Sequence, residues 1–370
     1  SSAHTLAELK AINNALSGTL TLGDYTVVLS GSSSDVAAAL DGTFASTYTG
    51  AASVNDAHNL SQLKTINNGT SGTITLTDYT VALNGSSSDV AAALDGSFAA
   101  NYTGTVSLTD THTLDQLKTI NNGTTNTITL NDYTVGLSGS TADVKAALAG
   151  TFNEAYSGNV TLDDADGTNI TATDITTIEG DTSGTITVSN NINIKGTAAE
   201  VAAAVADVNT FTDTPTAELS SAHTLAELKA INNALSGTLT LNDYSVGLNG
   251  SSADVAAALD GTFAADYTGT ASLNNIHTLD QLKTINNGTT NTITLDDYTI
   301  DLEGSTADVK AALAGTFNES YTGDVTLDDN DEVDIQATDI TTIEGDTSGT
   351  VTVSNNINLQ GTATAVAAAV

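Results

Sequence analysis

The feature that most constrains the fold is a three-residue motif that recurs thirteen times: Leu or Val, any residue, then Asp, Asn or Ser. Successive motifs are 32, 22, 32, 22, 32, 26, 31, 22, 32, 22, 32 and 26 residues apart. Such self-similarity is typical of stacked repeats, in which each unit buries its apolar face against its neighbours. We therefore expect a solenoid. The third position of the motif is occupied by Asp24, Asp56, Asp78, Asp110, Asp132, Asp164, Asn190, Ser221, Asp243, Asn275, Asp297, Asp329 and Asn355.

Two kinds of module account for these spacings. A modules of 54 residues each begin near one histidine, the five being His4, His58, His112, His223 and His277, and each holds two tyrosines at fixed points. B modules lack both residue types and contain Asp-Ile-Thr-Thr-Ile-Glu-Gly at residues 174–180 and 339–345. We expect one continuous solenoid, cut from a longer chain, with modules A 1–54, A 55–108, A 109–162, B 163–217, A 218–273, A 274–327 and B 328–370.

Each A module is expected to hold two strand–helix coils, of about 22 and 32 residues. The shorter coil has a strand such as 106–108 and a helix over about 114–120, opened by a Thr113-x-x-Gln116 capping box. The longer coil has a strand such as 73–76, a corner at Asp78, a second extended piece at 80–83 and a helix near 89–94. The expected fold class is α/β, a right-handed, leucine-rich-repeat-like solenoid with a parallel sheet along one side.

Helix ends and one weak point are also predicted. The Asn121-Asn122 pair is expected to end a helix, because asparagine tolerates the left-handed conformation found there. Gly96 and its equivalents are expected at the stop position of the helix in the longer coil, where a residue without a side chain is favoured. Pro215 is the only proline and lies between the first B module and the next A module. The sequence around it is the best candidate for a boundary or a bend.

Charge excludes several classes of partner. The chain has 44 acidic residues, 8 lysines and no arginine, for a net charge of −36. Nucleic acids and anionic membranes require clustered cations, so neither is expected to bind, whereas cations are attracted. No cysteine is present, which excludes disulfides and thiolate metal sites, and no apolar run reaches the length of a membrane span.

The recurring Asp of the motif has two interpretations. If the strands stack about 4.8 Å apart, the carboxylates form most of a column along one edge, and they repel one another or draw in cations. Alternatively, each side chain accepts hydrogen bonds from backbone donors at its own corner, as in an Asx turn. The replacement of Asp by Asn or Ser at four of the thirteen positions favours the second interpretation.

Calcium is considered where the B modules carry extra acidic residues. Six to eight oxygen ligands are needed, and these loops supply several, although neither completes an EF-hand and a solvated acidic turn is the alternative. The candidate ligands are Asp163, Asp164, Asp166, Asp328, Asp329 and Asp331.

The remaining constellations point to structure rather than catalysis. Equivalent histidines are two coils, roughly 10 Å, apart by strand spacing. Because one ion cannot bridge them, we expect them to pack or to form hydrogen bonds. Thr-x-Thr pairs such as Thr73 and Thr75 recur on the polar strand face, where rows of hydroxyl groups can order water. Residues repeated in every coil are poor catalysts, so no enzymatic activity is expected.

Residues 117–124 (Leu-Lys-Thr-Ile-Asn-Asn-Gly-Thr), 139–150 (Gly-Ser-Thr-Ala-Asp-Val-Lys-Ala-Ala-Leu-Ala-Gly) and 172–179 (Ala-Thr-Asp-Ile-Thr-Thr-Ile-Glu) carry a resemblance. They resemble repeats in very large secreted or cell-surface proteins of marine cyanobacteria and related bacteria. The resemblance implies an extracellular or cell-surface location and a structural or adhesive role. We expect a rigid scaffold, filament or surface-layer segment that self-associates. The alternative is an adhesin or surface-binding module for glycan, mineral or ice.

Overall fold

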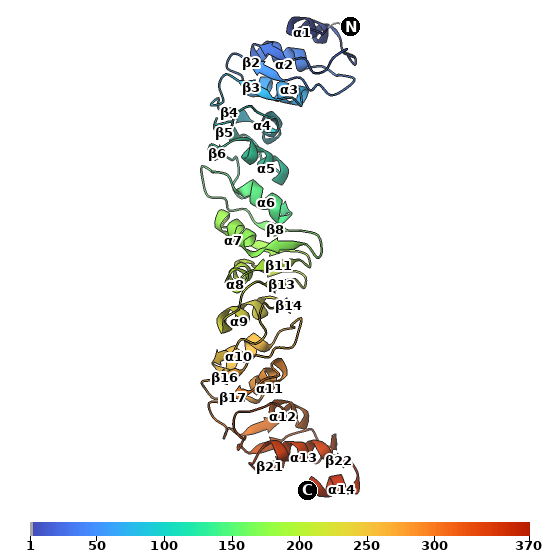
Figure 1. Ribbon diagram of the computed structural model, residues 1–370, viewed down its shortest axis with the longest axis vertical. Coiled ribbons are helices and arrows are strands. Elements are labelled where there is room, and N and C mark those ends of the chain that lie inside the picture. The colour runs from blue at the N-terminus through green and yellow to red at the C-terminus, as the bar shows by residue number, and fades with distance from the viewer. Residues whose placement is uncertain (1–2) are drawn as a thin grey trace. The chain divides into compact units, whose positions relative to one another are not determined.

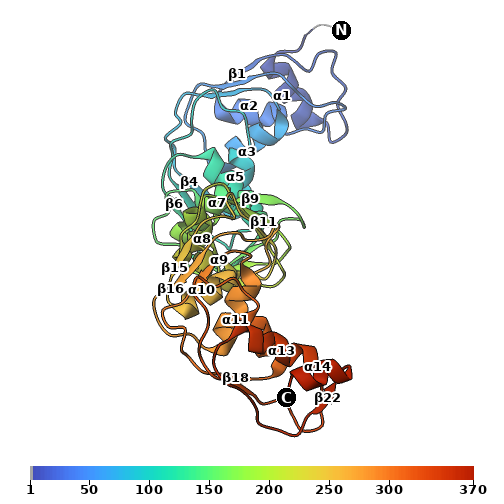
Figure 2. The same cartoon turned by 60° about the horizontal axis from the view of Figure 1, so that its bottom comes forward.

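The computed structural model describes residues 3–370 and divides into two compact units. The first unit consists of residues 3–164 and 174–189, and the second of residues 165–173 and 190–370. In both units short strands alternate with helices, and elements that are neighbours in sequence pack together (Figures 1 and 2). The division runs through the first B module. Pro215, where the sequence suggested a boundary, lies inside the second unit.

Helices and strands follow one another regularly in the first unit. Its helices are α1 (Leu6–Ala15), α2 (Ser33–Leu40), α3 (Leu60–Gly69), α4 (Ser87–Leu94), α5 (Leu114–Gly123), α6 (Thr141–Leu148) and, from its third residue, α7 (Ala172–Asp181). Its strands are β1 (Leu29–Gly31), β2 (Ala52–Val54), β3 (Ile74–Leu76), β4 (Leu83–Gly85), β5 (Val106–Leu108), β6 (Ile128–Thr129), β7 (Leu137–Gly139), β8 (Val160–Leu162) and β10 (Ile186–Val188).

The second unit repeats the same alternation. Its helices are α8 (Ala198–Asp207), α9 (Leu225–Ala234), α10 (Ser252–Leu259), α11 (Leu279–Gly288), α12 (Thr306–Leu313), α13 (Ala337–Asp346) and α14 (Ala363–Ala368). Its strands are β9 (Asn169–Thr171), β11 (Asn193–Gly196), β12 (Thr210–Phe211), β13 (Thr216–Leu219), β14 (Leu239–Thr240), β15 (Leu248–Gly250), β16 (Ala271–Leu273), β17 (Ile293–Thr294), β18 (Leu302–Gly304), β19 (Val325–Leu327), β20 (Asp334–Gln336), β21 (Val351–Val353) and β22 (Asn358–Gln360).

Strand pairing is parallel, as expected, but it is not continuous along either unit. In the first unit the strands form three groups, β1-β2-β3, β4-β5-β6 and β7-β8-β10. The interruption falls at the Asp-Tyr corner between β3 and β4. There the Tyr79 hydroxyl accepts the Leu76 amide, and the Tyr79 carbonyl accepts the amide of Thr103 (2.8 Å). The single long sheet predicted from the sequence is therefore a series of short sheets separated by corners.

Helix starts agree with the sequence. Thr113 caps α5, and the Gln116 side-chain oxygen accepts a hydrogen bond from the Thr113 amide, which completes the capping box. The inward face of α5 is formed by Leu117 and Ile120, both fully buried. The same arrangement recurs in α1, α3, α9 and α11, with Asn as the cap of α3.

The helix ends predicted at the Asn-Asn pairs differ from the structure. Asn121 and Asn122 do not terminate α5, which continues through them to Gly123. The Asn121 side-chain amide donates to the Ala146 carbonyl of α6 (2.6 Å), so this residue joins two successive helices. Asn67 makes the equivalent bond to Ala92 (2.7 Å).

Gly96 directly follows the end of a helix, as predicted, because α4 ends at Leu94 and is capped by Asp95. Within residues 3–370 the only glycines with positive φ are Gly167 and Gly361, so Gly96 is not in the left-handed region. A Cβ at Gly96 would lie 1.8 Å from the Oδ1 atom of Asn67. Glycine is needed here because the asparagine of the neighbouring helix occupies the space of a side chain. The equivalents Gly42, Gly150, Gly261 and Gly315 meet Asn13, Asn121, Asn232 and Asn286.

Candidate functional site

Each lysine of the chain forms an ion pair with a carboxylate of the next coil. The Lys118 ammonium lies 2.8 Å from Asp143, and the pair joins α5 to α6. The Asp143 carboxylate also accepts from Ser140, and these bonds hold its pKa below the ordinary value, with Lys118 the larger cause. All eight lysines, which lie within residues 3–370, are used in this way. The pairs are Lys10–Asp35, Lys64–Asp89, Lys118–Asp143, Lys145–Asp174, Lys195–Glu218, Lys229–Asp254, Lys283–Asp308 and Lys310–Asp339.

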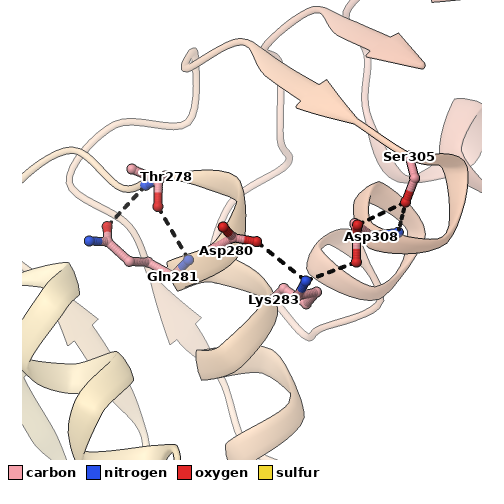
Figure 3. A network of polar contacts seen from close by, with 6 residues as sticks. All are labelled: Thr278, Asp280, Gln281, Lys283, Ser305 and Asp308. Carbon is pink, nitrogen blue, oxygen red and sulfur yellow. Dashed lines mark hydrogen bonds and ion pairs between the residues drawn. The ribbon is translucent and has the colours of Figure 1, made fainter. Parts of the chain in front are cut away.

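Figure 3 shows one such link in the second unit. Lys283 of α11 lies between Asp280 of its own helix (3.3 Å) and Asp308 of α12 (2.8 Å). Asp308 also accepts from the Ser305 hydroxyl (2.8 Å), and Ser305 is the cap of α12. The helix cap and the link between coils therefore share one carboxylate. The sequence analysis missed this link, although lysine followed 25 residues later by aspartate is a visible signal.

The Asp of the recurring motif occupies two alternating environments. In the longer coils it forms an Asx turn, as the second interpretation predicted: Asp78 Oδ1 accepts from the Thr80 amide and hydroxyl, each at 2.7 Å. These bonds hold the Asp78 pKa below its ordinary value, the hydroxyl of Thr80 being the larger cause. The same turn is made by Asp24, Asp132, Asp243 and Asp297.

The other set of motif residues caps the helix of the preceding coil. Asp110 Oδ1 accepts the amide of Ser87, the first residue of α4, at 2.7 Å. The first amides of a helix have no partner within the helix, and the helix dipole favours an acceptor there. The column of carboxylates thus divides into corner residues and inter-coil caps. The cap pairs are Ser33–Asp56, Ser87–Asp110, Thr141–Asp164, Ala198–Ser221, Ser252–Asn275 and Thr306–Asp329.

The histidines have the hydrogen-bonding role that the sequence suggested. His58 Nε2 lies 2.9 Å from the hydroxyl of Tyr102, which donates to the Val81 carbonyl at 2.7 Å. The chain from imidazole to hydroxyl to carbonyl recurs in all five A modules. His58 is 4% exposed and Tyr102 is 1% exposed. The sequence signal was the constant separation of 44 residues between His and Tyr.

Hydrogen bonding fixes which ring nitrogen carries the proton when the buried histidines are neutral. A tyrosine hydroxyl has one proton, and Tyr102 donates it to Val81, so the hydroxyl must accept from Nε2–H of His58. The other ring nitrogen, Nδ1, is buried and has no partner in His58, His112, His223 and His277. Burial lowers the pKa of these four imidazoles, and it outweighs the opposing effect of nearby carboxylates such as Asp78.

The candidate calcium ligands act mainly as hydrogen-bond acceptors between coils. Asp164 and Asp329 cap α6 and α12. Asp166 accepts from the Asn191 amide and Asp331 from the Asn356 amide, each at 3.0 Å. The remaining two candidates are Asp163 and Asp328. The Asp163 carboxylate accepts a long hydrogen bond from the Ser138 hydroxyl (3.4 Å). The backbone amide of Asp328 donates to the Gly304 carbonyl.

Within residues 3–370, no three acidic or histidine side chains come together as ligands of one ion. Calcium at these loops therefore remains a prediction. The two loops share one backbone feature: Gly167 has φ +74°, and Glu332, at the equivalent position, has φ +63°.

Outward side chains of the short sheets form rows of hydroxyl groups. Strand register places Ser30 opposite Ser53, and Ser53 opposite Thr75. Because alternate residues of a strand point to opposite faces, Leu29 and Val54 are buried while these hydroxyl residues remain partly exposed. The rows contain serine as well as threonine, and they end where each short sheet ends.

A shallow recess recurs beside the helix ends of the A modules. One such recess has a volume of about 970 Å³ and is lined by Phe44, Lys64 and Asn68 among other residues. Equivalent recesses near Phe98 and Phe263 have volumes of about 510 and 530 Å³. Each is lined by a half-buried phenylalanine. This ring packs against the buried tyrosine that is hydrogen-bonded to the histidine of the module, as Phe44 packs against Tyr48.

Comparison with known proteins gives no assignment: no family model matches the chain, and a search of curated proteins finds no match. Within residues 3–370, no helix has both the length and the apolar character needed to span a bilayer.

Proposed function

We propose that this chain is a structural repeat protein, a rigid segment of an extracellular or cell-surface scaffold, filament or surface layer. The proposed form is one right-handed solenoid of seven modules, with coils of about 22 and 32 residues. The observation that carries the proposal is that every lysine forms an ion pair with a carboxylate of the next coil. Links of this kind join each coil to its neighbour along the array.

The charge supports the same role. The chain has 44 acidic residues but only 8 lysines, so its net charge is −36 and most of its carboxylates have no lysine to neutralise them. Such a surface repels parallel copies and attracts cations, whose binding would screen the repulsion. The resemblance to repeats of large secreted proteins points to the same setting. Cation stabilisation, including calcium at the B-module loops, is part of the proposal.

The first and last described coils leave apolar side chains exposed that are buried in equivalent coils. Ile12 is 39% exposed, whereas its equivalent Ile66 is fully buried. Val353 is 38% exposed, whereas its equivalent Val188 is 1% exposed. In a stacked array these residues are covered by the next coil, which a continuation of the polypeptide or a second copy can supply.

Electron microscopy of the 370-residue chain, with calcium and with a chelator, tests the proposal. We expect rods of uniform width that join end to end, and fewer joined rods for Ile12→Asp. The matched control is Ile276→Asp, which alters an exposed apolar residue outside the ends (61% exposed). Globules in place of rods would contradict the scaffold. Dispersed short particles at every calcium concentration would contradict the filament.

A second candidate function is an adhesin or surface-binding module. The in-register hydroxyl row of Ser30, Ser53 and Thr75 favours it, because a regular polar row can match a repeating glycan, a mineral or ice. A glycan array and an ice-recrystallisation assay test it. Binding that Ser53→Val and Thr75→Val abolish, and that Thr80→Val leaves intact, would support this function over the scaffold.

A further inference from the structure

The four buried histidines form a repeated device that the scaffold role does not require. In the first unit, His58 precedes α3 and is bonded to Tyr102, which follows α4. Tyr102 in turn bonds the carbonyl of Val81, just before β4. One imidazole therefore helps to hold three separate segments of two adjacent coils. His112 does the same in the first unit, and His223 and His277 do so in the second.

We infer that these histidines make the array acid-labile: protonation of His58, His112, His223 and His277 opens the contacts between coils when the pH falls below neutrality. The geometry carries the inference. Nε2–H is committed to the tyrosine hydroxyl, so an added proton must go to Nδ1. Nδ1 is buried and has no acceptor within reach. A buried, charged donor without an acceptor is strongly unfavourable, and the imidazolium gains by leaving its site for water.

The pKa of each imidazole depends on desolvation and on nearby charged groups. The carboxylates that act on the histidines are Asp56 and Asp78 for His58, Asp132 for His112, Asp243 and Glu227 for His223, and Asp297 for His277. These carboxylates favour the protonated form. Desolvation exceeds their effect at all four sites and lowers each pKa. The Asx-turn carboxylates are themselves held ionised by Thr or Ser, so they keep their charge through the range in which histidine titrates.

The direction of the pH effect follows from linkage. A histidine whose pKa is lower in the folded state than in the unfolded state binds fewer protons when folded. Stability is then greatest above the unfolded pKa of 6.5 and is lost as the pH falls below it. Aspartates with lowered pKa values act only below about pH 4. Burial raises the pKa values of Asp181 and Asp346, which therefore change stability in the opposite direction, so the histidine effect is measured as the difference between the wild type and a variant that lacks these histidines.

Urea unfolding of the full chain, followed by circular dichroism between about pH 7.5 and pH 5, is the first test. For each titrating histidine, we expect the unfolding equilibrium constant to rise by up to about tenfold per pH unit below 6.5. A fourfold variant, H58Q/H112Q/H223Q/H277Q, keeps an N–H donor for each tyrosine but cannot titrate at these four positions, so its unfolding equilibrium constant should not rise as the pH falls through this range. His4→Gln is the matched control, because His4 is not fully buried, and it should keep the wild-type dependence. A fourfold variant that responds to pH as the wild type does would overturn the inference.

The second test needs no variant. In ¹⁵N-labelled wild-type protein, long-range nitrogen–proton spectra should show the Nε2–H tautomer for four histidines at pH 7.5. Those four should stay neutral in the folded state below pH 6.5. Nδ1–H tautomers, or folded-state titration at or above 6.5, would overturn the inference even if the fourfold variant failed to fold.

Discussion

Removing the tyrosine hydroxyl group that joins His58 to the Val81 carbonyl should destabilise the first unit. The substitution Tyr102→Phe keeps the ring, its packing against Phe98 and its volume. It removes the hydroxyl that lies 2.9 Å from His58 Nε2 and 2.7 Å from the Val81 carbonyl oxygen. Both partners then lose a hydrogen bond, and His58 has already one ring nitrogen without a partner.

The expected cost follows from those two lost bonds. Leaving a buried donor or acceptor without a partner costs about 1–3 kcal/mol. His58 is 4% exposed, so water cannot readily replace the lost bond. We expect Tyr102→Phe to lower the free energy of unfolding by about 2–4 kcal/mol. Tyr48→Phe is the matched control in the same unit: His4 is more exposed and can bond to water, so about 1–2 kcal/mol is expected.

Global urea unfolding combined with hydrogen exchange measures both variants. Exchange read on peptides is required as well, because long repeat arrays need not unfold in one step. Tyr102→Phe should speed exchange at the Leu83 amide, which bonds the Thr105 carbonyl, more than at the amides of α1. Equal costs for the two variants, or a cost below about 0.5 kcal/mol for Tyr102→Phe, would refute the reasoning.

Three further predictions concern other parts of the structure. Ile120→Ala should lower the free energy of unfolding by about 2–5 kcal/mol, because Ile120 is fully buried. Ile12→Ala, at the equivalent but 39% exposed position, should cost well under half as much, and urea unfolding measures both. Gly104→Ala should destabilise the protein by about 3 kcal/mol, because its Cβ would lie 2.0 Å from the Val81 carbonyl oxygen. Gly180→Ala, in an open part of α7, should stabilise the protein by roughly 0.5–1 kcal/mol. Similar urea midpoints for the two variants would contradict this prediction. Thr80→Val should raise the pKa of Asp78 toward its ordinary value, measured by carboxyl ¹³C NMR, because that pKa is lowered by the Thr80 bonds. The stability from these bonds is present above the unfolded pKa of 3.8 and is lost as the pH falls below it, so the variant should lose less stability in acid.

Local signals in the sequence predicted the elements well. The capping box at Thr113 and Gln116 involves groups only three residues apart, and the structure contains it. Parallel pairing was also predicted, because a strand–helix–strand repeat of this length brings consecutive strands side by side in one direction. Such features depend on residues within one coil or on the repeat itself.

Contacts between coils were predicted less well. Asn121 has a side chain suited to ending a helix, but its bond to Ala146 of the next coil keeps it inside α5. Gly96 was predicted at the end of α4, but the sequence did not show what requires glycine there, which is the side chain of Asn67 from the neighbouring helix. The capping of α4 by Asp110 joins residues 23 apart in sequence. Tertiary distances decide these three roles, and local pattern does not contain them.

The pairing of every lysine has a consequence for proteolysis. Trypsin-like proteases cleave after lysine or arginine, and this chain has eight lysines and no arginine. Seven of the lysines lie in helices and Lys195 lies in β11, so each susceptible bond is held in regular structure while its side chain is engaged by a carboxylate. Cleavage requires local opening of the chain, which this arrangement opposes. The same links that join the coils therefore protect the folded protein from a common class of extracellular digestive enzyme.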